Sequence, residues 1–374
     1  MGKRTEFLYL DEEEMIKAGV LDSARCVDVL DEMFQLVGKG DYIMGGPNQN
    51  EHGIKLSFPK EPQFPNMPAD GPDRRFMAMV AYLGGRFNIA GEKWYGSNIE
   101  NPSWGLPRSV LMVMLNNVVT GEPVALMSGN LVSAVRTGSV PGVGVRYLAR
   151  KDSEIIGLIG AGPIQKACLQ GIMVDAKNAR VIRIFDIHAE TAQKFGEWAK
   201  EQYGVDYVVC ESMQDAISSA DIISAATSRL RPVHIKNEWL KKGSLIMFTG
   251  SGRVDEEYFT SCKLYFDNAK MHAAYMEDAR RSAGPIEEAY NGMMGGQIYG
   301  MIDAGKLPAV ESFPSLGDCA CGAIKGREND EERICLMTSG MPIEDVAWSY
   351  DCYERAVKMG LGTKLKLWDS PHWS

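Results

Sequence analysis

From about residue 153 onward, short apolar runs alternate with patterns typical of amphipathic helices. The apolar runs are EIIGLIG, RVIRIFD, DYVVC, DIISAAT, SLIMFTG and KLYFD. Between the second and the third, the segment AETAQKFGEWAKEQ places Ala192, Phe195 and Ala199 three and four residues apart, on one face of a helix. Alternation of this kind predicts a parallel sheet covered by helices, an α/β fold.

The two ends of the chain have a different pattern. The segment LDEEEMIKAG and residues 22–38 predict helices, whereas residues 41–125 predict Gly- and Pro-rich loops with short strands, a mixed α+β region. Near the C-terminus, IEDVAWSYDCYERAVKMGLG predicts one long helix that ends at Gly360 and Gly362. Residues 269–330 show no clear period, so NGMMGGQIYG and CACGAIKGREND are expected to form loops.

Composition narrows the class of protein. A length of 374 residues suggests two domains, and a net charge of −9 without a clustered basic run argues against a nucleic-acid or membrane partner. The apolar stretches are too short to span a bilayer, and MGKRTEFLYLDEEEM lacks a signal-peptide pattern, so a cytoplasmic protein is expected. The eight cysteines are scattered and match neither a zinc site nor a disulfide framework, so no metal is predicted.

The strand EIIGLIG runs into AGPIQKACLQGI, a turn of the kind that binds dinucleotides. Gly160 would permit the tight turn, and Gly162 would let backbone N–H groups and the helix N-terminus approach a pyrophosphate. Gln165 occupies the third glycine position, so the motif is incomplete. Small residues at such a turn also serve helix–sheet packing, so the glycines alone are weak evidence.

The next strand ends in Asp186, 24 residues after Gly162, about where a carboxylate accepts the ribose hydroxyls of a dinucleotide. This acid would repel a 2′-phosphate, and His188 is the nearest basic residue, so NAD(H) is favoured over NADP(H). The alternative is that Asp186 only caps the following helix.

Two later strand ends, SAATSRLRP and FTGSGR, lie where open parallel sheets bind ligands. Their small residues could form the walls of a nicotinamide pocket, or could be ordinary turn residues. The residues expected to bind the cofactor are Thr137, Gly160, Ala161, Gly162, Pro163, Ile164, Gln165, Asp186, Ile187, Ala226, Thr227, Ser228, Thr249 and Ser251.

Several motifs together resemble one known family. The segments GEKWYGSNIENPSWGLPRS, LNNVVTGEPVALMSGNLVSAVRTGS, VRYLARKD, IGLIGAGPIQ, ADIISAAT and TSGMPIEDVAWSYDCYERAVKMGLG follow one another as in the ornithine cyclodeaminase/mu-crystallin family. The resemblance extends over nearly the whole chain. It implies a Rossmann-type, doubly wound domain over residues 133–334 and a discontinuous α+β domain, residues 1–132 with 335–374, that binds substrate and forms a homodimer.

The resemblance also implies the chemistry, the interconversion of an amino acid and its imine through a nicotinamide. In the family pattern, the lysine of the KW segment and the arginine of the RT segment grip the substrate carboxylate, and these match Lys93 and Arg136. A second cation near Lys93 would also lower the pKa of its ammonium group, which suits a lysine that exchanges a proton with the substrate nitrogen. Otherwise, Lys93 would be a solvated loop lysine and Arg136 a structural ion-pair partner.

The sequence departs from the family pattern at two places. Cyclodeaminases carry an aspartate at the end of the fifth Rossmann strand, where this chain has Ser251 or Gly252, with Asp255 farther along the loop. An arginine common before the KW segment is also absent. The segment MGGPNQNEHGIKLSFP has the polar residues Asn48, Gln49 and His52 instead, which predicts a different pocket for the substrate side chain. Arg75, together with Arg74, could supply replacement charge to this pocket or could simply be exposed.

These departures leave three functions to weigh. The first is an NAD(H)-dependent oxidoreductase acting on a C–N bond: an amino-acid dehydrogenase, an imine or ketimine reductase, or an opine-type enzyme. The second is a cyclodeaminase that releases ammonia from ornithine or lysine, which the missing aspartate weakens. The third is a non-catalytic binder of nucleotide and small acids. The side chain of the substrate, the direction of reaction and the role of residues 312–330 stay open.

Overall fold

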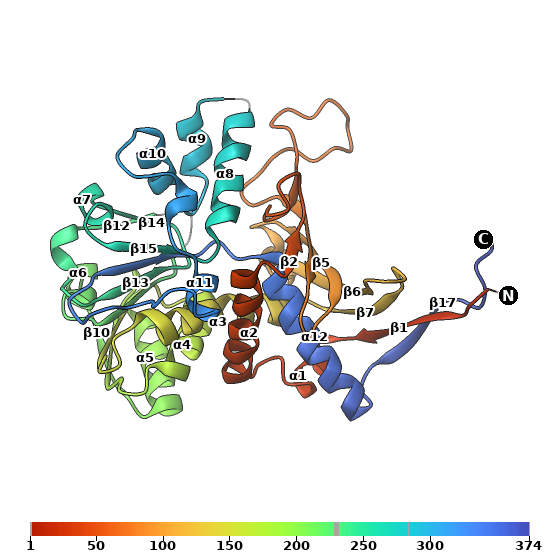
Figure 1. The fold of residues 1–374 in the computed structure, drawn as a ribbon, viewed down its shortest axis with the longest axis horizontal. Helices are drawn as coiled ribbons and strands as arrows, with labels where there is room; N and C mark the ends of the chain where they lie inside the picture. The colour runs from red at the N-terminus through yellow and green to blue at the C-terminus, as the bar shows by residue number, and fades with distance from the viewer. Residues whose placement is uncertain (1, 228–231, 283, 374) are drawn as a thin grey trace. The chain divides into compact units, whose positions relative to one another are not determined.

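The computed structural model describes residues 2–227, 232–282 and 284–373, which form two compact units (Figure 1). The first unit comprises Met1–Asp22, Gly40–Arg136 and Met341–Ser374. The second comprises Ser23–Lys39 and Thr137–Gly340. Each unit has its own sheet, and each is described in turn.

The first unit is built on a mixed sheet with the strand order β17-β1-β7-β6-β5-β4-β2, and β3 pairs with β4. Its long central strands are antiparallel, whereas β1 and β7 run parallel. The strands β1 and β17 run side by side toward the two ends of the chain (Figure 1). The strands are β1 (Thr5–Leu10), β2 (Tyr42–Met44), β3 (Ile54–Ser57), β4 (Arg75–Leu83), β5 (Ile89–Ser97), β6 (Ser109–Asn117), β7 (Pro123–Ser128) and β17 (Thr363–Trp368).

Helix α12 (Pro342–Met359) covers one face of this sheet by packing against β4, β5 and β6. Its sequence fixes both ends: Pro342 needs no amide partner at the first helical position, and Gly360 ends the helix with a φ of 68°. The helix therefore confirms the prediction from the C-terminal segment. A shorter helix, α1 (Glu12–Lys17), begins with a capping box between Asp11 and Glu14.

The second unit is a doubly wound domain around seven parallel strands in the order β10-β9-β8-β11-β13-β16-β15. This arrangement confirms the predicted α/β class, and each apolar run named above contains one strand. The strands are β8 (Ile155–Ile159), β9 (Val181–Phe185), β10 (Asp206–Val209), β11 (Ile222–Ala225), β13 (Leu245–Phe248), β15 (Lys263–Phe266) and β16 (Ile334–Met337), with the separate pair β12 (Val233–Ile235) and β14 (Gly252–Val254).

Helices α4, α5 and α6 follow β8, β9 and β10 along the chain and pack on the sheet of the second unit. The boundary between the units falls within helix α3: its residues up to Arg136 group with the first unit, and those from Thr137 onward group with the second. The helices are α2 (Ser23–Lys39), α3 (Asn130–Leu148), α4 (Pro163–Asp175), α5 (Ala189–Tyr203), α6 (Met213–Ile217), α7 (Glu256–Phe259), α8 (Ala269–Arg281), α9 (Ile286–Asn291), α10 (Gly296–Asp303) and α11 (Leu316–Ala320).

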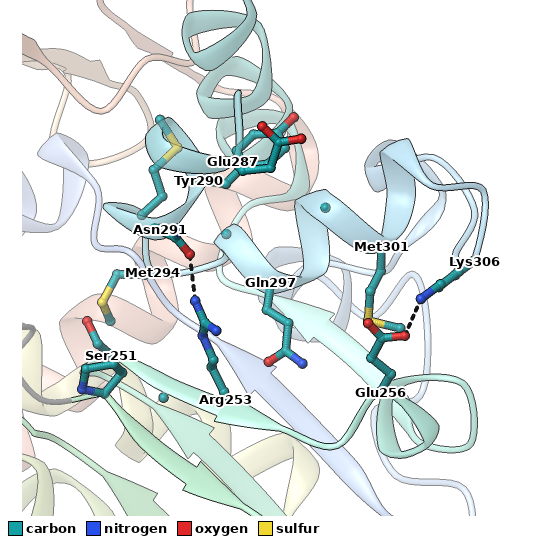
Figure 2. A pocket seen from close by; sticks show the side chains of 15 residues that line it. Ser251, Arg253, Glu256, Glu287, Tyr290, Asn291, Met294, Gln297, Met301 and Lys306 are labelled. Carbon is teal, nitrogen blue, oxygen red and sulfur yellow. Dashed lines mark hydrogen bonds and ion pairs between the residues drawn. The ribbon is translucent and has the colours of Figure 1, made fainter. Parts of the chain in front are cut away.

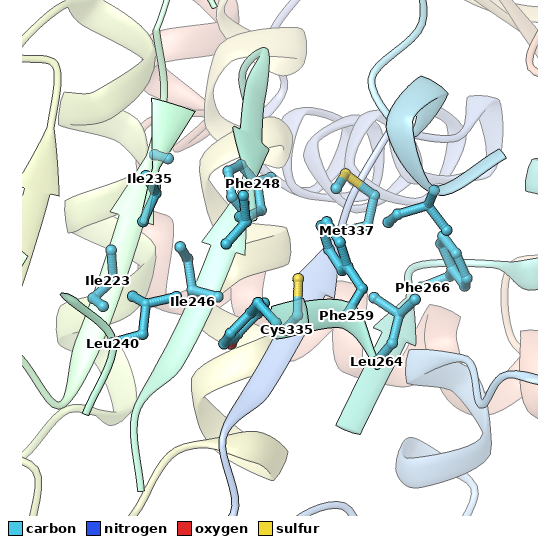
Figure 3. Close-up of a cluster of buried hydrophobic side chains, with 14 of the residues drawn as sticks. Ile223, Ile235, Leu240, Ile246, Phe248, Phe259, Leu264, Phe266, Cys335 and Met337 are labelled. Atoms are coloured by element: carbon cyan, nitrogen blue, oxygen red, sulfur yellow. The ribbon is translucent and has the colours of Figure 1, made fainter. Parts of the chain in front are cut away.

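Apolar side chains from neighbouring strands form the core of the second unit (Figure 3). Ile223, Ile246 and Phe248 lie on central strands, and Phe259 and Leu264 extend the cluster toward the sheet edge. All five side chains are at most a few per cent exposed. Burial of this extent is the main contribution to folding, and it holds the strand ends that carry the predicted cofactor residues in fixed positions.

The structure differs from the sequence-based outline in three elements. Helix α2 groups with the second unit because it packs against α11 and α4. Strand β16 lies between β13 and β15, so residues 335–337 belong to the parallel sheet rather than to the C-terminal segment. Residues 269–330, which showed no clear period, contain α8, α9, α10 and α11, and the GGQIYG segment, expected to be a loop, is largely helical.

Within the described residues, no helix has the length and apolar character needed to cross a membrane. The eight cysteines are free thiols. Over the same parts of the chain, no group of His, Cys, Asp and Glu side chains is arranged to hold a metal ion.

Candidate functional site

Lys93 and Arg136 lie in the first unit and are both buried, with 2% and 5% of their surface exposed. Lys93 stands in the middle of β5, paired with Met79 on β4 and Val113 on β6. Its Nζ donates a hydrogen bond to Ser133 Oγ on α3 at 3.2 Å. Arg136 follows Ser133 by one helical turn, so α3 presents both side chains on one face.

Two acidic residues of α12 bind these cations. Lys93 Nζ lies 2.8 Å from Asp345 Oδ2, and Arg136 Nε donates to Asp345 Oδ1 at 3.0 Å. Arg136 Nη1 also donates to Glu344 Oε2 at 2.6 Å. Glu344 and Asp345 are 0% exposed, so all four charges are held away from water. The structure thus brings together the two cations predicted from separate segments and adds two acids that were not predicted.

The environment of Lys93 lowers the pKa of its ammonium group from 10.5 to about 8. Burial is the largest cause, because removing the group from water disfavours its charged form. The positive charge of Arg136 lowers the pKa further, while Asp345 and Glu344 partly oppose the shift. The predicted effect of a second cation is therefore present, although it is secondary to burial. A lysine of this kind can exchange a proton near neutral pH.

Arg136 behaves differently although it is buried as deeply. Burial alone would lower the pKa of its guanidinium, but the carboxylates of Asp345 and Glu344 raise it above the ordinary value. Arg136 therefore stays charged at neutral pH, where Lys93 can exchange its proton. Its planar group suits the two-point binding of a carboxylate.

Arg75 lies on the same face of the sheet as Lys93. Arg75 on β4 pairs with Ser97 on β5, four residues along each strand from the Met79–Lys93 pair. Because side chains alternate between the two faces of a sheet, a separation of four residues places them on the same face. The ring of Tyr95 links them, with its centroid 5.8 Å from the Arg75 guanidinium and 5.7 Å from Lys93 Nζ. Arg75 also forms an ion pair with Asp73 at 2.5 Å, and Asp73 is shared with Arg108, which lies 2.7 Å from its other oxygen.

The polar residues of the preceding loop have local contacts. Asn48 Oδ1 accepts a hydrogen bond from Asn50 N at 2.9 Å. Gln49 has a φ of 59° and closes a turn in which its amide donates to Gly46 O. His52 is partly buried in the same loop. For Asn48 and Gln49, these bonds shape the loop, and their part in substrate binding stays a prediction.

The predicted cofactor loop joins β8 to α4 in the second unit. Gly160 has a φ of 94°, and a Cβ added there would lie 2.7 Å from Ala226 O, so the position requires glycine. Gly162 is the N-cap of α4, Pro163 is its first residue, and a Cβ added at Gly162 would meet open space. These features fit a pyrophosphate, which needs close approach to backbone N–H groups at a helix N-terminus.

The third position of the motif, Gln165, is fully buried between α4 and β11. Its Oε1 accepts a hydrogen bond from Ser224 Oγ at 3.4 Å. Close helix packing is provided by other glycines, because a Cβ at Gly138 of α3 would lie 2.2 Å from the backbone of Ala167. Gln165 therefore has a structural role that the motif assigns to glycine.

Asp186 lies at the end of β9 and contacts the cofactor loop. Its Oδ2 accepts from Ala161 N at 2.8 Å, and its Oδ1 accepts from His188 N at 2.9 Å. Each carboxylate oxygen can accept a second hydrogen bond, so capacity for a ribose hydroxyl remains. Ile187 and Ile164 are 63% and 39% exposed, an unusual position for two isoleucines that suits contact with a flat apolar ring.

The other predicted cofactor residues gather at the carboxyl ends of β11 and β13. Ala226 N donates to Ile159 O at 3.1 Å, which joins the ends of β8 and β11 at the point where strand order reverses. Thr227 Oγ1 donates to Ser251 O at 3.0 Å, and Thr249 N donates to Ala225 O at 3.0 Å. Ser228 lies outside the described residues, and Thr137 is on α3.

The carboxylate of Asp255 contacts His234 on β12 and the backbone of Asn237, so it is not a free catalytic base. Its Oδ2 accepts from Asn237 N at 2.8 Å, and its Oδ1 lies 2.9 Å from His234 Nε2. The hydrogen bond from Asn237 and the neighbouring His234 lower the pKa of this carboxyl. A carboxylate stabilised in this way is a weak base, so it does not replace the aspartate expected near Ser251 in a cyclodeaminase.

A cavity of about 420 Å³ lies between β14 and the helices α9 and α10 (Figure 2). Ser251 is among its lining residues. Arg253 donates to Asn291 Oδ1 at 2.6 Å, and Lys306 lies 2.5 Å from Glu256 (Figure 2). The charge of Lys306 is therefore balanced within the cavity, and Met293, Met294 and Met301 add an adaptable apolar lining.

The chain is similar to known proteins over nearly its whole length. An N-((2S)-2-amino-2-carboxyethyl)-L-glutamate dehydrogenase of Staphylococcus aureus is 27% identical over 97% of this chain and 99% of its own. An archaeal alanine dehydrogenase dimer with bound NAD has a TM-score of 0.77 at 26% identity, covering 97% and 100% of the two chains. The Δ1-pyrroline-2-carboxylate reductase of Thermococcus litoralis, in complex with NADH and L-proline, has a TM-score of 0.76 at 26% identity and covers 96% and 99%.

The model of one protein family matches residues 20–360, which include the whole second unit, most of the first and every residue of the candidate site. The buried cations, the dinucleotide loop and the parallel sheet all lie within the matched range. The chain belongs to the ornithine cyclodeaminase/mu-crystallin family.

Proposed function

We propose that the protein is an NAD(H)-dependent oxidoreductase that interconverts an amino acid and its imine. The observation that carries the proposal is the buried pair of cations, of which Lys93 has a pKa of about 8. A carboxylate needs charged donors for binding, and reduction of an imine needs a proton for nitrogen. Arg136 holds the carboxylate, and Lys93 both holds it and exchanges the proton.

Different parts of the chain bind the substrate and the cofactor. The first unit, which includes Lys93 and Arg136, binds the substrate, and the second unit binds the dinucleotide through the Gly160–Gly162 loop. NADH, when bound, supplies the hydride that adds to the imine carbon. Because the cofactor supplies this step, the protein contributes orientation of the carboxylate, exclusion of water from Lys93 and delivery of one proton. In the opposite direction, Lys93 takes up the proton and water hydrolyses the imine.

Asp186 makes NAD(H) the cofactor in preference to NADP(H). Its carboxylate stands at the end of β9 and accepts a backbone hydrogen bond from Ala161 of the phosphate-binding loop. A 2′-phosphate at this position would lie against a negative charge. The solved relatives named above contain NAD or NADH, which supports the same choice.

Homodimer formation in the cytoplasm completes the proposal. The sheet face of the first unit that α12 does not cover carries exposed Phe76, Val80, Trp94, Val110 and Met112. A contiguous apolar surface of this kind is unusual on a monomer and is typical of an interface between protein chains. The archaeal alanine dehydrogenase is described as a dimer, which supports a second copy as the partner.

The test is hydride transfer, followed by NADH absorbance. The purified chain is given NADH or NADPH with a panel of cyclic imino acids, and of 2-oxo acids paired with amines. Oxidation of NADH with at least one member, and slower oxidation of NADPH, is expected. Ammonia release from ornithine or lysine without net NADH would show cyclodeamination instead. Tight binding without turnover of any pair would show a carrier protein.

A further inference from the structure

The four buried charges of the candidate site balance one another. Lys93 and Arg136 contribute two positive charges, and Glu344 and Asp345 contribute two negative charges at 2.6–3.0 Å. Asp351, the next buried acid of α12, pairs with Arg86 at 3.2 Å. The two cations are therefore not a free positive site that waits for an anion, because each already has a buried partner.

Charge balance restricts the ligand. A bound carboxylate adds one negative charge to a cluster that is already neutral, in a place from which water is excluded. An uncompensated buried charge is costly, so a second positive charge must arrive with the carboxylate. That charge can be carried by the ligand, as an ammonium or iminium nitrogen, or by a proton that one carboxylate of the site takes up.

We infer that Glu344 and Asp345 make the site selective for ligands of net zero charge, namely zwitterionic amino acids and protonated imino acids. This inference rests on the proposed function for the position of the ligand. Glu344 and Asp345 act as positioning and specificity residues, since they contact the cations rather than the reacting atoms. In the reductive direction, the site admits the iminium carboxylate and disfavours the 2-oxo acid, whose net charge is −1.

The selected form is also the form that reacts. Hydride adds to the carbon of a C=N⁺ bond, the π electrons move to nitrogen, and the neutral amine so formed takes a proton from Lys93, with NAD⁺ as the oxidised partner. An unprotonated imine would place a negative charge on nitrogen, which is unfavourable. Selection against net charge therefore favours binding of the protonated, reactive imine.

Isothermal titration calorimetry of the full chain loaded with NADH tests the inference. The probes are L-proline and cyclopentanecarboxylate, which share a ring and a carboxylate but differ by one charged nitrogen. NADH is used because its reduced ring is uncharged. We expect L-proline to bind on the order of 100-fold more tightly. Buffers of different ionisation enthalpy should show uptake of about one proton with cyclopentanecarboxylate and none with L-proline.

Substitutions of Glu344 test the cause of the selectivity. Glu344→Gln leaves a net positive cluster, so the preference for L-proline should narrow by about tenfold, and proton uptake with cyclopentanecarboxylate should disappear. Glu344→Asp keeps the charge and should keep the preference. Glu354→Gln is the matched control, because Glu354 lies on the same helix and pairs with Arg86 at the surface.

Equal affinity of the wild-type chain for the two probes, or binding of cyclopentanecarboxylate without proton uptake, would overturn the inference. This result needs no variant to fold. The proposed function is tested separately by hydride transfer. Turnover together with equal affinity for the two probes would contradict the inference alone. Tighter binding of L-proline without turnover of any substrate would contradict the proposed function alone.

Discussion

Lys93 Nζ lies 2.8 Å from Asp345 Oδ2, and both side chains are buried. The pair joins the middle of a strand to the first turn of a helix far along the chain. Breaking a buried ion pair by removing one partner leaves an uncompensated charge and typically costs about 3–5 kcal/mol. The stability of the fold and the activity therefore both depend on the contact between Lys93 and Asp345.

Lys93→Met should abolish most of the activity while leaving the cofactor site intact. Loss of a proton donor that also holds the carboxylate should lower kcat/KM by about 10³-fold. The affinity for NADH should be unchanged, because the dinucleotide loop lies in the second unit. Steady-state NADH oxidation and titration of NADH fluorescence measure the two quantities.

The matched control is Lys55→Met on β3, since Lys55 is an exposed lysine of the same sheet. Its activity should equal that of the wild type. Near-normal turnover of the Lys93→Met variant would remove Lys93 from the mechanism, whatever its contacts.

The pH dependence of imine reduction should report Lys93. Because its ammonium has a pKa of about 8, kcat/KM for reduction should be constant below pH 8 and fall above it as the proton donor is lost. Glu344 raises this pKa through its negative charge, so Glu344→Gln should shift the fall to lower pH. The Glu354→Gln control should leave the profile in place. A profile that is flat from pH 7 to 9.5 would contradict the assignment.

The free energy of unfolding should also depend on the protonation of Lys93. The pKa of Lys93 is about 8 in the folded chain and 10.5 in the unfolded one, so the unfolded chain binds more protons between these values. The contribution of Lys93 to the free energy of unfolding should therefore rise as the pH increases from 8 to 10.5. Urea unfolding of the wild type and of Lys93→Met should show a difference that grows over this window.

Asp186→Asn should weaken the preference for NADH over NADPH. The substitution keeps the size of the side chain and an oxygen that can accept from Ala161 N, but removes the charge that repels a 2′-phosphate. The ratio of the two dissociation constants should change by about tenfold, as measured by fluorescence titration. Asp206→Asn on β10, an exposed acid paired with Lys200, should leave the ratio unchanged. An unaltered ratio in the Asp186 variant would mean that another residue selects the cofactor.

Local signals in the sequence were sufficient for most of the parallel sheet. Strands buried on both faces need continuous apolar runs, which a few adjacent residues reveal. The turn from β8 into α4 needs a positive φ, which Gly160 reveals in the same way. Strand β16 escaped prediction because ICLM follows a charged segment and is separated from β15 by more than 60 residues, which hides the alternation of strands and helices. The helices between 269 and 320 escaped because glycines and methionines obscure their period.

The acids of the candidate site were missed for another reason. Acidic residues in the first turn of a helix are common, since they interact favourably with the helix dipole, so Glu344 and Asp345 appeared ordinary. Their partner Arg136 is 208 and 209 residues away, a separation at which sequence pattern carries no contact information. The available signal was their place in IEDVAW, where two acids interrupt an otherwise apolar stretch at the start of the helix.

Gly160→Ala should destabilise the second unit and impair cofactor binding together. The new Cβ would lie 2.7 Å from Ala226 O at a φ of 94°, so the loop must move away from the end of β11. We expect a loss of about 1–3 kcal/mol in the free energy of unfolding and weaker NADH binding. Denaturant unfolding and fluorescence titration measure these effects.

Gly204→Ala separates backbone strain from the steric clash. Gly204 ends α5 with a φ of 68°, and a Cβ added there has no neighbour within 4 Å. It should therefore cost only about 1 kcal/mol, the ordinary price of a left-handed alanine, and should leave NADH affinity unchanged. If both variants bind NADH equally well, the turn at Gly160 does not hold the pyrophosphate. The dinucleotide must then lie elsewhere on the sheet edge.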